Sequence, residues 1–184
     1  MPYSYDRRTA SGTPTLDTFG RKDRTPTLSP IRDDIQRESR SVAGSIEALI
    51  RSKGDLSVAA VQRIQAARHS ISMNSGIVLK DTGKLLDFFQ PLVSRGASEI
   101  SSLPESGPLD SRDKYEAQGL LDAIVEVRAR RDTLATDMER QTDDAALEQV
   151  AADVGTLYKA VDALWLGYKS FLSTWKQRLK RSKV

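Results

Sequence analysis

Residue types that carry most enzyme chemistry are scarce in this chain of 184 residues. It contains no cysteine and one histidine, so a thiol nucleophile and a zinc–thiolate site are excluded. That histidine, His69, lies five residues after Ile64 and two before Ile71, on the outer face of a predicted helix. We therefore assign His69 to the surface, with no catalytic or metal-binding role.

Carboxylates offer a second route to chemistry, and adjacent pairs occur at Asp33–Asp34 and Asp143–Asp144. Neighbouring residues of a helix point in different directions, and carboxylates at a helix start complement its dipole, which explains both pairs. A carboxylate di-metal bundle needs Glu-x-x-His on two helices, which one histidine cannot supply. No glycine-rich phosphate loop is present. The sequence predicts no enzyme, cofactor, metal site or small-molecule substrate.

The densest charge lies at the C-terminus, where six bases and no acid follow Asp162. Bases at the end of a helix complement its dipole, which is one explanation. The other is contact with a nucleic acid, an import receptor or, less favoured, an anionic membrane surface. The candidate contacts are Lys176, Arg178, Lys180, Arg181 and Lys183.

Residues 1–28 are predicted to form a disordered tail. They are rich in Ser, Thr, Gly and Pro and hold too little apolar surface to offset the entropy of ordering. The sequence Thr-Pro-Thr-Leu occurs at 13–16 and again at 25–28. A regulated docking segment and an ordinary disordered tail both explain this composition. If the segment is regulated, the candidate phosphorylation sites are Ser11, Thr13, Thr25 and Ser29.

Apolar residues at helical spacing predict four helices in the remainder, at about 29–53, 55–90, 111–141 and 143–180, with a loop at 101–111. The second helix carries a seven-residue repeat, Ile64, Ile71, Val78, Leu85 and Leu92. The stripe of the fourth, from 147 to 179, holds both tryptophans and should contain the densest core. Pro91 is expected to end or bend the second helix.

Two polar residues interrupt these stripes. Asn74, followed by Ser75 and Gly76, either divides the second helix or is a buried polar group that fixes its register. The seven-residue repeat persists across it, which favours an unbroken or kinked helix. Arg131 lies on the apolar face of the third predicted helix, at a position where an aliphatic residue is expected. It would then pair with a buried acid or line a partner surface.

The predicted fold is all-α: an elongated antiparallel four-helix bundle or coiled-coil-like domain over residues 29–184, preceded by the tail. The second and fourth helices, at roughly 36 residues, would span roughly 54 Å. A compact bundle of this chain needs less, so part of a seam should be available to a partner or a second copy.

We predict a non-catalytic scaffold or adaptor subunit that mediates protein–protein assembly and is regulated through its tail. The alternative is a nucleic-acid-associated, coat-like or filament-forming protein that uses its basic helix ends on phosphate backbones. No apolar run is long enough to cross a membrane, and Met1–Asp17 contains no apolar block. We therefore expect an intracellular protein, cytoplasmic or nuclear.

Overall fold

The structure is a computed structural model that describes residues 28–103, 108–140 and 143–181. These residues form four helices and no strand: α1 (Leu28–Ser52), α2 (Val58–Ser102), α3 (Pro108–Arg140) and α4 (Asp144–Arg181). The predicted all-α helical bundle is confirmed. The candidate sites Ser11, Thr13, Thr25 and Lys183 lie outside the described residues, as do positions 1–27 of the predicted tail.

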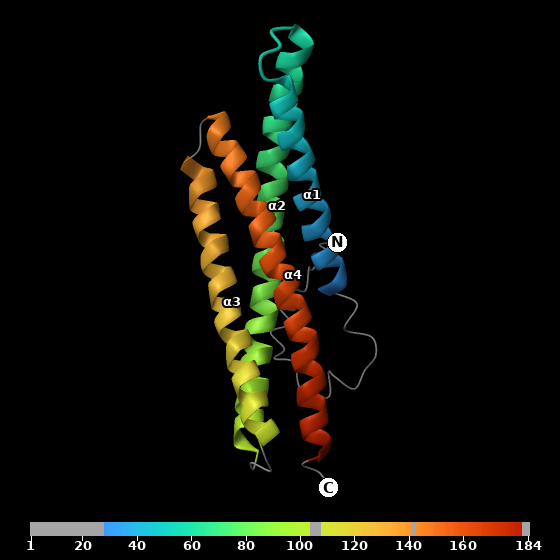
Figure 1. Cartoon of the computed structure of the whole chain (residues 1–184), viewed down its shortest axis with the longest axis vertical. Coiled ribbons are helices and arrows are strands. Elements are labelled where there is room, and N and C mark those ends of the chain that lie inside the picture. Colours follow the sequence, from blue (N-terminus) through green and yellow to red (C-terminus); the bar gives the residue numbers. More distant parts are fainter. Residues whose placement is uncertain (1–27, 104–107, 141–142, 182–184) are drawn as a thin grey trace, which may run out of the picture.

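Helices α2 and α4 form the centre of the bundle. Each packs against the other and against both α1 and α3, whereas α1 and α3 lie on opposite sides of this pair and do not touch over the described residues. Along the long axis, α1 rises, α2 descends, α3 rises and α4 descends (Figure 1). Arg68 bonds to Asp144 at one end and Trp175 to Glu99 at the other, and both contacts join residues 76 positions apart. Helices α2 and α4 therefore run parallel in a constant register.

The predicted apolar stripes supply the core. In α2, the seven-residue repeat is buried from Ile71 onward and half-buried at Ile64. In α1, the residues seven apart, Ile35, Val42 and Leu49, are fully buried. The stripe of α4 is the longest, and its buried members are Val150, Val154, Leu157, Val161, Leu164, Tyr168, Phe171 and Trp175. Seven-residue spacing thus identified the inward face of each of these helices.

Pro91 does not end α2, which was one of the two expected outcomes. The helix continues for eleven residues beyond it to Ser102. A proline inside a helix costs about 3 kcal/mol because it removes one hydrogen bond and crowds the preceding turn. Leu92, Val93 and Ile100 lie beyond it and are all buried. Each contributes about 1.5–3 kcal/mol by leaving water, so packing outweighs the proline.

Two other helix ends differ in detail. α1 begins at Leu28, one residue before the predicted start at about 29, and its first turn contains no acid. The loop expected at 101–111 is shorter, because α2 extends to Ser102 and α3 starts at Pro108. Gly54 has a φ of 88°, a left-handed conformation that suits the residue after a helix end.

Candidate partner-binding groove

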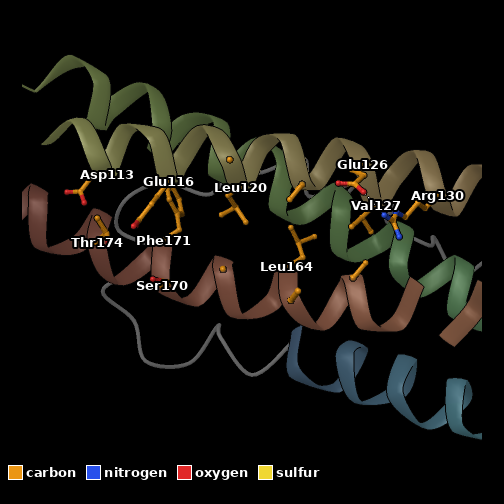
Figure 2. Close-up of a pocket in the computed structure, with 15 residues that line it drawn as sticks. Asp113, Glu116, Leu120, Glu126, Val127, Arg130, Leu164, Ser170, Phe171 and Thr174 are labelled. Atoms are coloured by element: carbon orange, nitrogen blue, oxygen red, sulfur yellow. Dashed lines mark hydrogen bonds and ion pairs between the residues drawn. The ribbon is translucent and has the colours of Figure 1, made fainter. Parts of the chain in front are cut away.

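An open groove runs along the outer face between α3 and α4 (Figure 2). Its volume is about 520 Å³. Its apolar lining includes Leu120 and Val127 from α3 and Leu164 and Phe171 from α4. These side chains belong to the core and are buried, yet they also border the hollow. The groove therefore gives solvent access to the edge of the hydrophobic core.

Small residues line this groove on both helices, and one of them, Gly167, makes room for Leu120, whose Cδ1 would lie 3.2 Å from an added Cβ atom. The lining includes Gly119 and Ala123 on α3 and Ala160, Ala163 and Gly167 on α4. A Cβ atom built on Gly119 would meet no other atom within 4 Å, so the space beside this glycine is empty. Residues without long side chains allow the backbone of another helix to approach closely.

A second hollow of about 360 Å³ continues the groove along the same two helices. The two hollows share Glu126 and Arg130. The second one is lined by Leu134 and Leu157 together with alanine, threonine and aspartate side chains. On α3 the lining runs from Asp113 to Asp137, which corresponds to about 36 Å of helix at 1.5 Å per residue.

The rim of the groove is acidic, although the whole chain has a formal charge of +3. Arg130 is the single base that lines the two hollows, and it pairs with Glu126 at 2.6 Å. This pair is exposed and contributes little to stability, so its members can exchange partners. The acidic residues of the lining are Asp113, Glu116, Glu126, Asp137 and Asp153, of which the first three pair with Arg178, Arg112 and Arg130.

The opposite side of α4, facing α2, is closed by aromatic side chains. A Cβ atom on Gly96 of α2 would lie 2.5 Å from Cζ of Phe171 and 3.0 Å from Cδ2 of Trp175. The indole Nε1–H of Trp175 donates to Oε2 of Glu99 at 3.0 Å. One or two turns away, the rings of Phe89 and Tyr168 stack with centroids 4.3 Å apart. Burial raises the pKa of the Tyr168 hydroxyl above its usual value.

The bases of the C-terminal cluster differ in exposure: Arg178 is buried, whereas the other bases that the structure describes are exposed. Nε of Arg178 donates to Oδ2 of Asp113 at 2.5 Å, and the Arg178 side chain is only 10% exposed. Arg178 is therefore an internal link between α4 and α3, which corrects its assignment as a surface contact for polyanions. Lys176, Lys180 and Arg181 are exposed at the end of α4.

Arg131 contacts the backbone of α2. Its Nε donates to the carbonyl oxygen of Leu79 at 2.8 Å, and its Nη1 pairs with Asp132, the next residue, at 2.7 Å. Gly83 makes room for this approach, because a Cβ atom there would lie 3.2 Å from the guanidinium. The expected pairing with a buried acid is wrong, since Asp132 is 59% exposed. The arginine instead joins α3 to α2.

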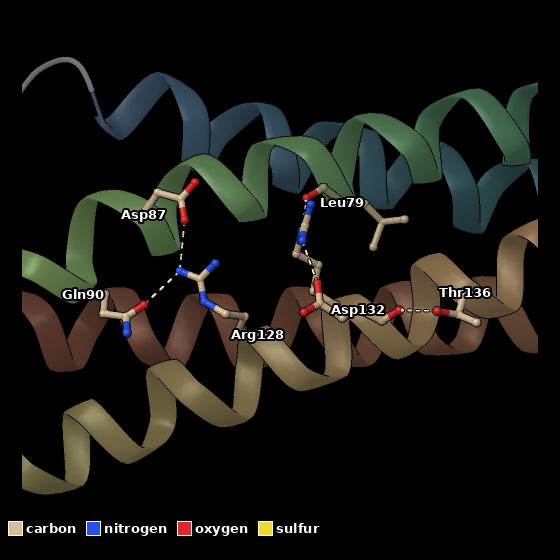
Figure 3. Close-up of polar contacts among 7 residues, drawn as sticks. Leu79, Asp87, Gln90, Arg128, Asp132 and Thr136 are labelled. Carbon is tan, nitrogen blue, oxygen red and sulfur yellow. Dashed lines mark hydrogen bonds and ion pairs between the residues drawn. The ribbon is translucent and has the colours of Figure 1, made fainter. Parts of the chain in front are cut away.

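A second arginine of α3 reinforces the same interface. Nη2 of Arg128 donates to Asp87 and to Gln90 of α2, both at 3.0 Å (Figure 3). Gln90 directly precedes Pro91, which cannot donate a backbone hydrogen bond, and Asp87 lies four positions before it. The side chains of Arg128 and Arg131 thus both form hydrogen bonds between α3 and α2.

Asn74 joins α1 to α2 in the unbroken second helix. Its Nδ2 donates to the hydroxyl oxygens of Ser41, at 2.7 Å, and of Ser70, at 3.0 Å. Ser45 and Ser70 are also hydrogen-bonded, at 2.8 Å. Asn74 and Ser70 of α2 therefore form side-chain hydrogen bonds with Ser41 and Ser45 of α1.

The other candidate residues lie apart from the groove. His69 is exposed on α2, and Ser29 is exposed in the first turn of α1. Among the residues that the structure describes, no group of three or more His, Cys, Asp or Glu side chains is placed to hold a metal ion. None of the described helices is both long and apolar enough to cross a bilayer.

Sequence reasoning did not identify the groove. Its signal was present as small residues three or four positions apart, Gly119 and Ala123 on α3 and Ala160, Ala163 and Gly167 on α4. Nothing in the spacing shows that the two sets face the same hollow. Comparison with protein-family models, curated proteins and solved structures finds no significant match to the chain.

Proposed function

We propose that this chain is a non-catalytic helical scaffold or adaptor whose α3–α4 groove binds one amphipathic helix of a partner protein. The observation that carries the proposal is the apolar groove with an acidic rim on an otherwise basic chain. A helix with an apolar stripe flanked by Lys or Arg would place its stripe on Leu120 and Leu164 and its bases beside the rim.

The dimensions of the groove suit a single helix. About 36 Å of lining along α3 accommodates a partner helix of six to seven turns. The glycines and alanines allow this helix to approach closely, and the exposed Glu126–Arg130 pair can open to receive a partner's base. Affinity would come from the apolar floor, and the rim would select against acidic helices.

The direct test is titration with two synthetic amphipathic helices of equal length that share a leucine stripe. One carries lysine beside the stripe and the other carries glutamate. We expect the lysine helix to bind at least about tenfold more tightly, since rim charges select partners. In the variant Ala163→Trp, an indole occupies the groove and binding should be lost.

The matched control is Ala43→Trp, which places the same side chain on the exposed face of α1. It should bind the lysine helix as the wild type does. Equal binding of both helices would contradict the charge argument, and equal binding by Ala163→Trp would place the site elsewhere. Light scattering measures self-association: a dimer that Ala163→Trp abolishes would identify a second copy as the partner.

Phosphorylation of the N-terminal region at Ser11, Thr13, Thr25 or Ser29 is part of this proposal. Ser29 is exposed in the first turn of α1, where a phosphate would interact favourably with the helix dipole. Phosphorylated and unmodified chains should differ in affinity for the lysine helix. Equal affinities would contradict regulation by phosphorylation but would not affect the proposal that the groove binds a helix.

A second candidate function is binding to nucleic-acid backbones by a coat-like protein. It is favoured by the exposed bases Lys176, Lys180 and Arg181 at one end of the bundle. Binding to single-stranded nucleic acid should then weaken steeply with salt and fall in the variant Lys180→Gln/Arg181→Gln. Absence of binding at low salt would exclude it.

A further inference from the structure

The hairpin of α1 and α2 projects beyond the rest of the bundle, above the turn between α3 and α4 (Figure 1). Arg68 of α2 pairs with Asp144, the first residue of α4, at 2.7 Å. Because α2 begins at Val58, ten residues earlier, about 15 Å of helix extends past the start of α4. We call residues 50–63 the hairpin tip.

The hairpin tip exposes four aliphatic side chains. Leu56 is 95% exposed and Val58 is 76% exposed, and Ile50 and Val61 are about half exposed. They stay exposed although Lys53 of the same tip pairs with Glu148 of α4 at 2.6 Å. Four large apolar side chains exposed within one short segment are unfavourable in water and indicate a binding surface.

The loop that carries Leu56 is held in one conformation by local hydrogen bonds. Oδ1 of Asp55 accepts from the backbone N–H of Ser57 at 2.9 Å, which lowers the pKa of this carboxyl. The Ser57 hydroxyl oxygen accepts from the N–H of Ala60 at 3.1 Å and caps α2. Gly54 supplies the left-handed turn. The apolar side chains are therefore presented outward without a further ordering cost.

The hairpin tip is also basic. It contains Arg51, Lys53 and Arg63 against one acid, Asp55, although Arg51 pairs with Glu47 of α1 at 3.3 Å and Lys53 with Glu148 of α4 at 2.6 Å. Arg63 pairs with Asp55 at 3.4 Å, and both side chains are about half exposed. Such exposed pairs contribute little, so these bases can turn toward an external anion.

We propose that the hairpin tip binds the surface of an anionic lipid bilayer. Four aliphatic side chains on a convex tip offer a few hundred Å² at most, well below the roughly 800 Å² that each partner contributes to a stable protein interface. Unlike a protein partner, a fluid bilayer does not need a surface whose shape complements the tip. The aliphatic side chains enter the boundary between headgroups and acyl chains, and the bases contact lipid phosphates. Since the groove lies on the side of the bundle, it stays accessible to a partner.

The test is co-sedimentation of the full chain with phosphatidylserine/phosphatidylcholine vesicles and with phosphatidylcholine vesicles. Binding should occur on the anionic vesicles, weaken with salt, and be much lower on neutral ones. Leu56→Ser/Val58→Ser removes exposed apolar groups and should reduce partitioning at least about tenfold. Arg51→Gln/Arg63→Gln should reduce the salt-dependent part.

The matched control is Val125→Ser/Leu166→Ser, which changes two side chains, each 61% exposed, on the body of α3 and α4. It should bind vesicles as the wild type does, and circular dichroism should show all variants equally helical. Failure to sediment with anionic vesicles at low salt would overturn the proposal. So would unchanged sedimentation of Leu56→Ser/Val58→Ser, or a dimer in light scattering that this variant abolishes.

Discussion

On the side of α4 that faces α2, Phe171 and Trp175 occupy the space left by a glycine, Gly96. On the side that faces α3, the space beside Gly119 is empty and forms part of a hollow of about 520 Å³. The same residue type therefore serves tight packing in one interface and an open groove in the other. What differs is what lies beside the glycine: aromatic rings at Gly96, and no atom within 4 Å at Gly119.

The side of α4 that faces α2 therefore contributes mainly to stability, and the side that faces α3 contributes to the proposed binding. The α2–α4 interface buries the largest side chains of the chain, so changes there should act on the free energy of unfolding. The α3–α4 groove leaves space to solvent beside its small residues, so changes at residues such as Gly119 and Ala163 should act on binding and leave stability almost unaltered.

The largest effect is expected for Gly96→Leu. The added side chain has no room beside Phe171, and overpacking of this kind costs about 3 kcal/mol or more. Urea unfolding should show a correspondingly lower free energy of unfolding. Stability equal to the wild type would show that α2 and α4 are not closely packed at this glycine.

Asp113→Ala tests the ion pair at one end of the groove. Removing the carboxylate leaves the mostly buried Arg178 without this partner, which should cost about 2–3 kcal/mol. The control Glu116→Ala breaks the exposed pair with Arg112 and should cost less than about 1 kcal/mol. Equal losses in thermal unfolding would mean that burial of Arg178 has no energetic role.

Gly83→Ala tests the contact between Arg131 and α2. The new methyl group would lie 3.2 Å from the guanidinium and should disturb its bond to the Leu79 carbonyl. The loss of about 1 kcal/mol for this hydrogen bond is nearly offset by the gain of about 1 kcal/mol from alanine in a helix. In the Arg131→Met background the loss is absent, so the same substitution should stabilise the protein by about 1 kcal/mol. A double-mutant cycle without coupling would exclude the contact.

The smallest effect on the fold is expected for Gly119→Ala. Nothing opposes the added methyl group, and alanine favours the helix by up to about 1 kcal/mol over glycine. Thermal unfolding should occur at the same or a slightly higher temperature. A destabilisation of more than 1 kcal/mol would show that the groove is closed in solution.

The sequence allowed the helices and their buried faces to be predicted because seven-residue spacing depends on one helix at a time. The repeat of Ile71, Val78, Leu85 and Leu92 illustrates this: it was evident from the sequence, and all four residues are buried. The continuation of α2 through Pro91 was missed, because it depends on what Leu92 and Ile100 pack against. Contacts between helices distant in sequence were missed for the same reason.

Arg178 shows the limit for the candidate site. In the sequence it belongs to a run of bases, and its pairing with Asp113, 65 positions away, depends on the register of α3 on α4. The groove depends likewise on the distance between two helix axes, which no residue pattern within either helix encodes.

The most direct test of the proposed groove is methyl NMR of the full chain during titration with the lysine-flanked helix. The account predicts that the methyl signals of Ala123, Ala160 and Ala163 shift, because these residues line the groove, while that of Ala43 on α1 does not. Shifts confined to α1, or no shifts at saturating helix, would contradict the assignment of the α3–α4 groove as the binding site.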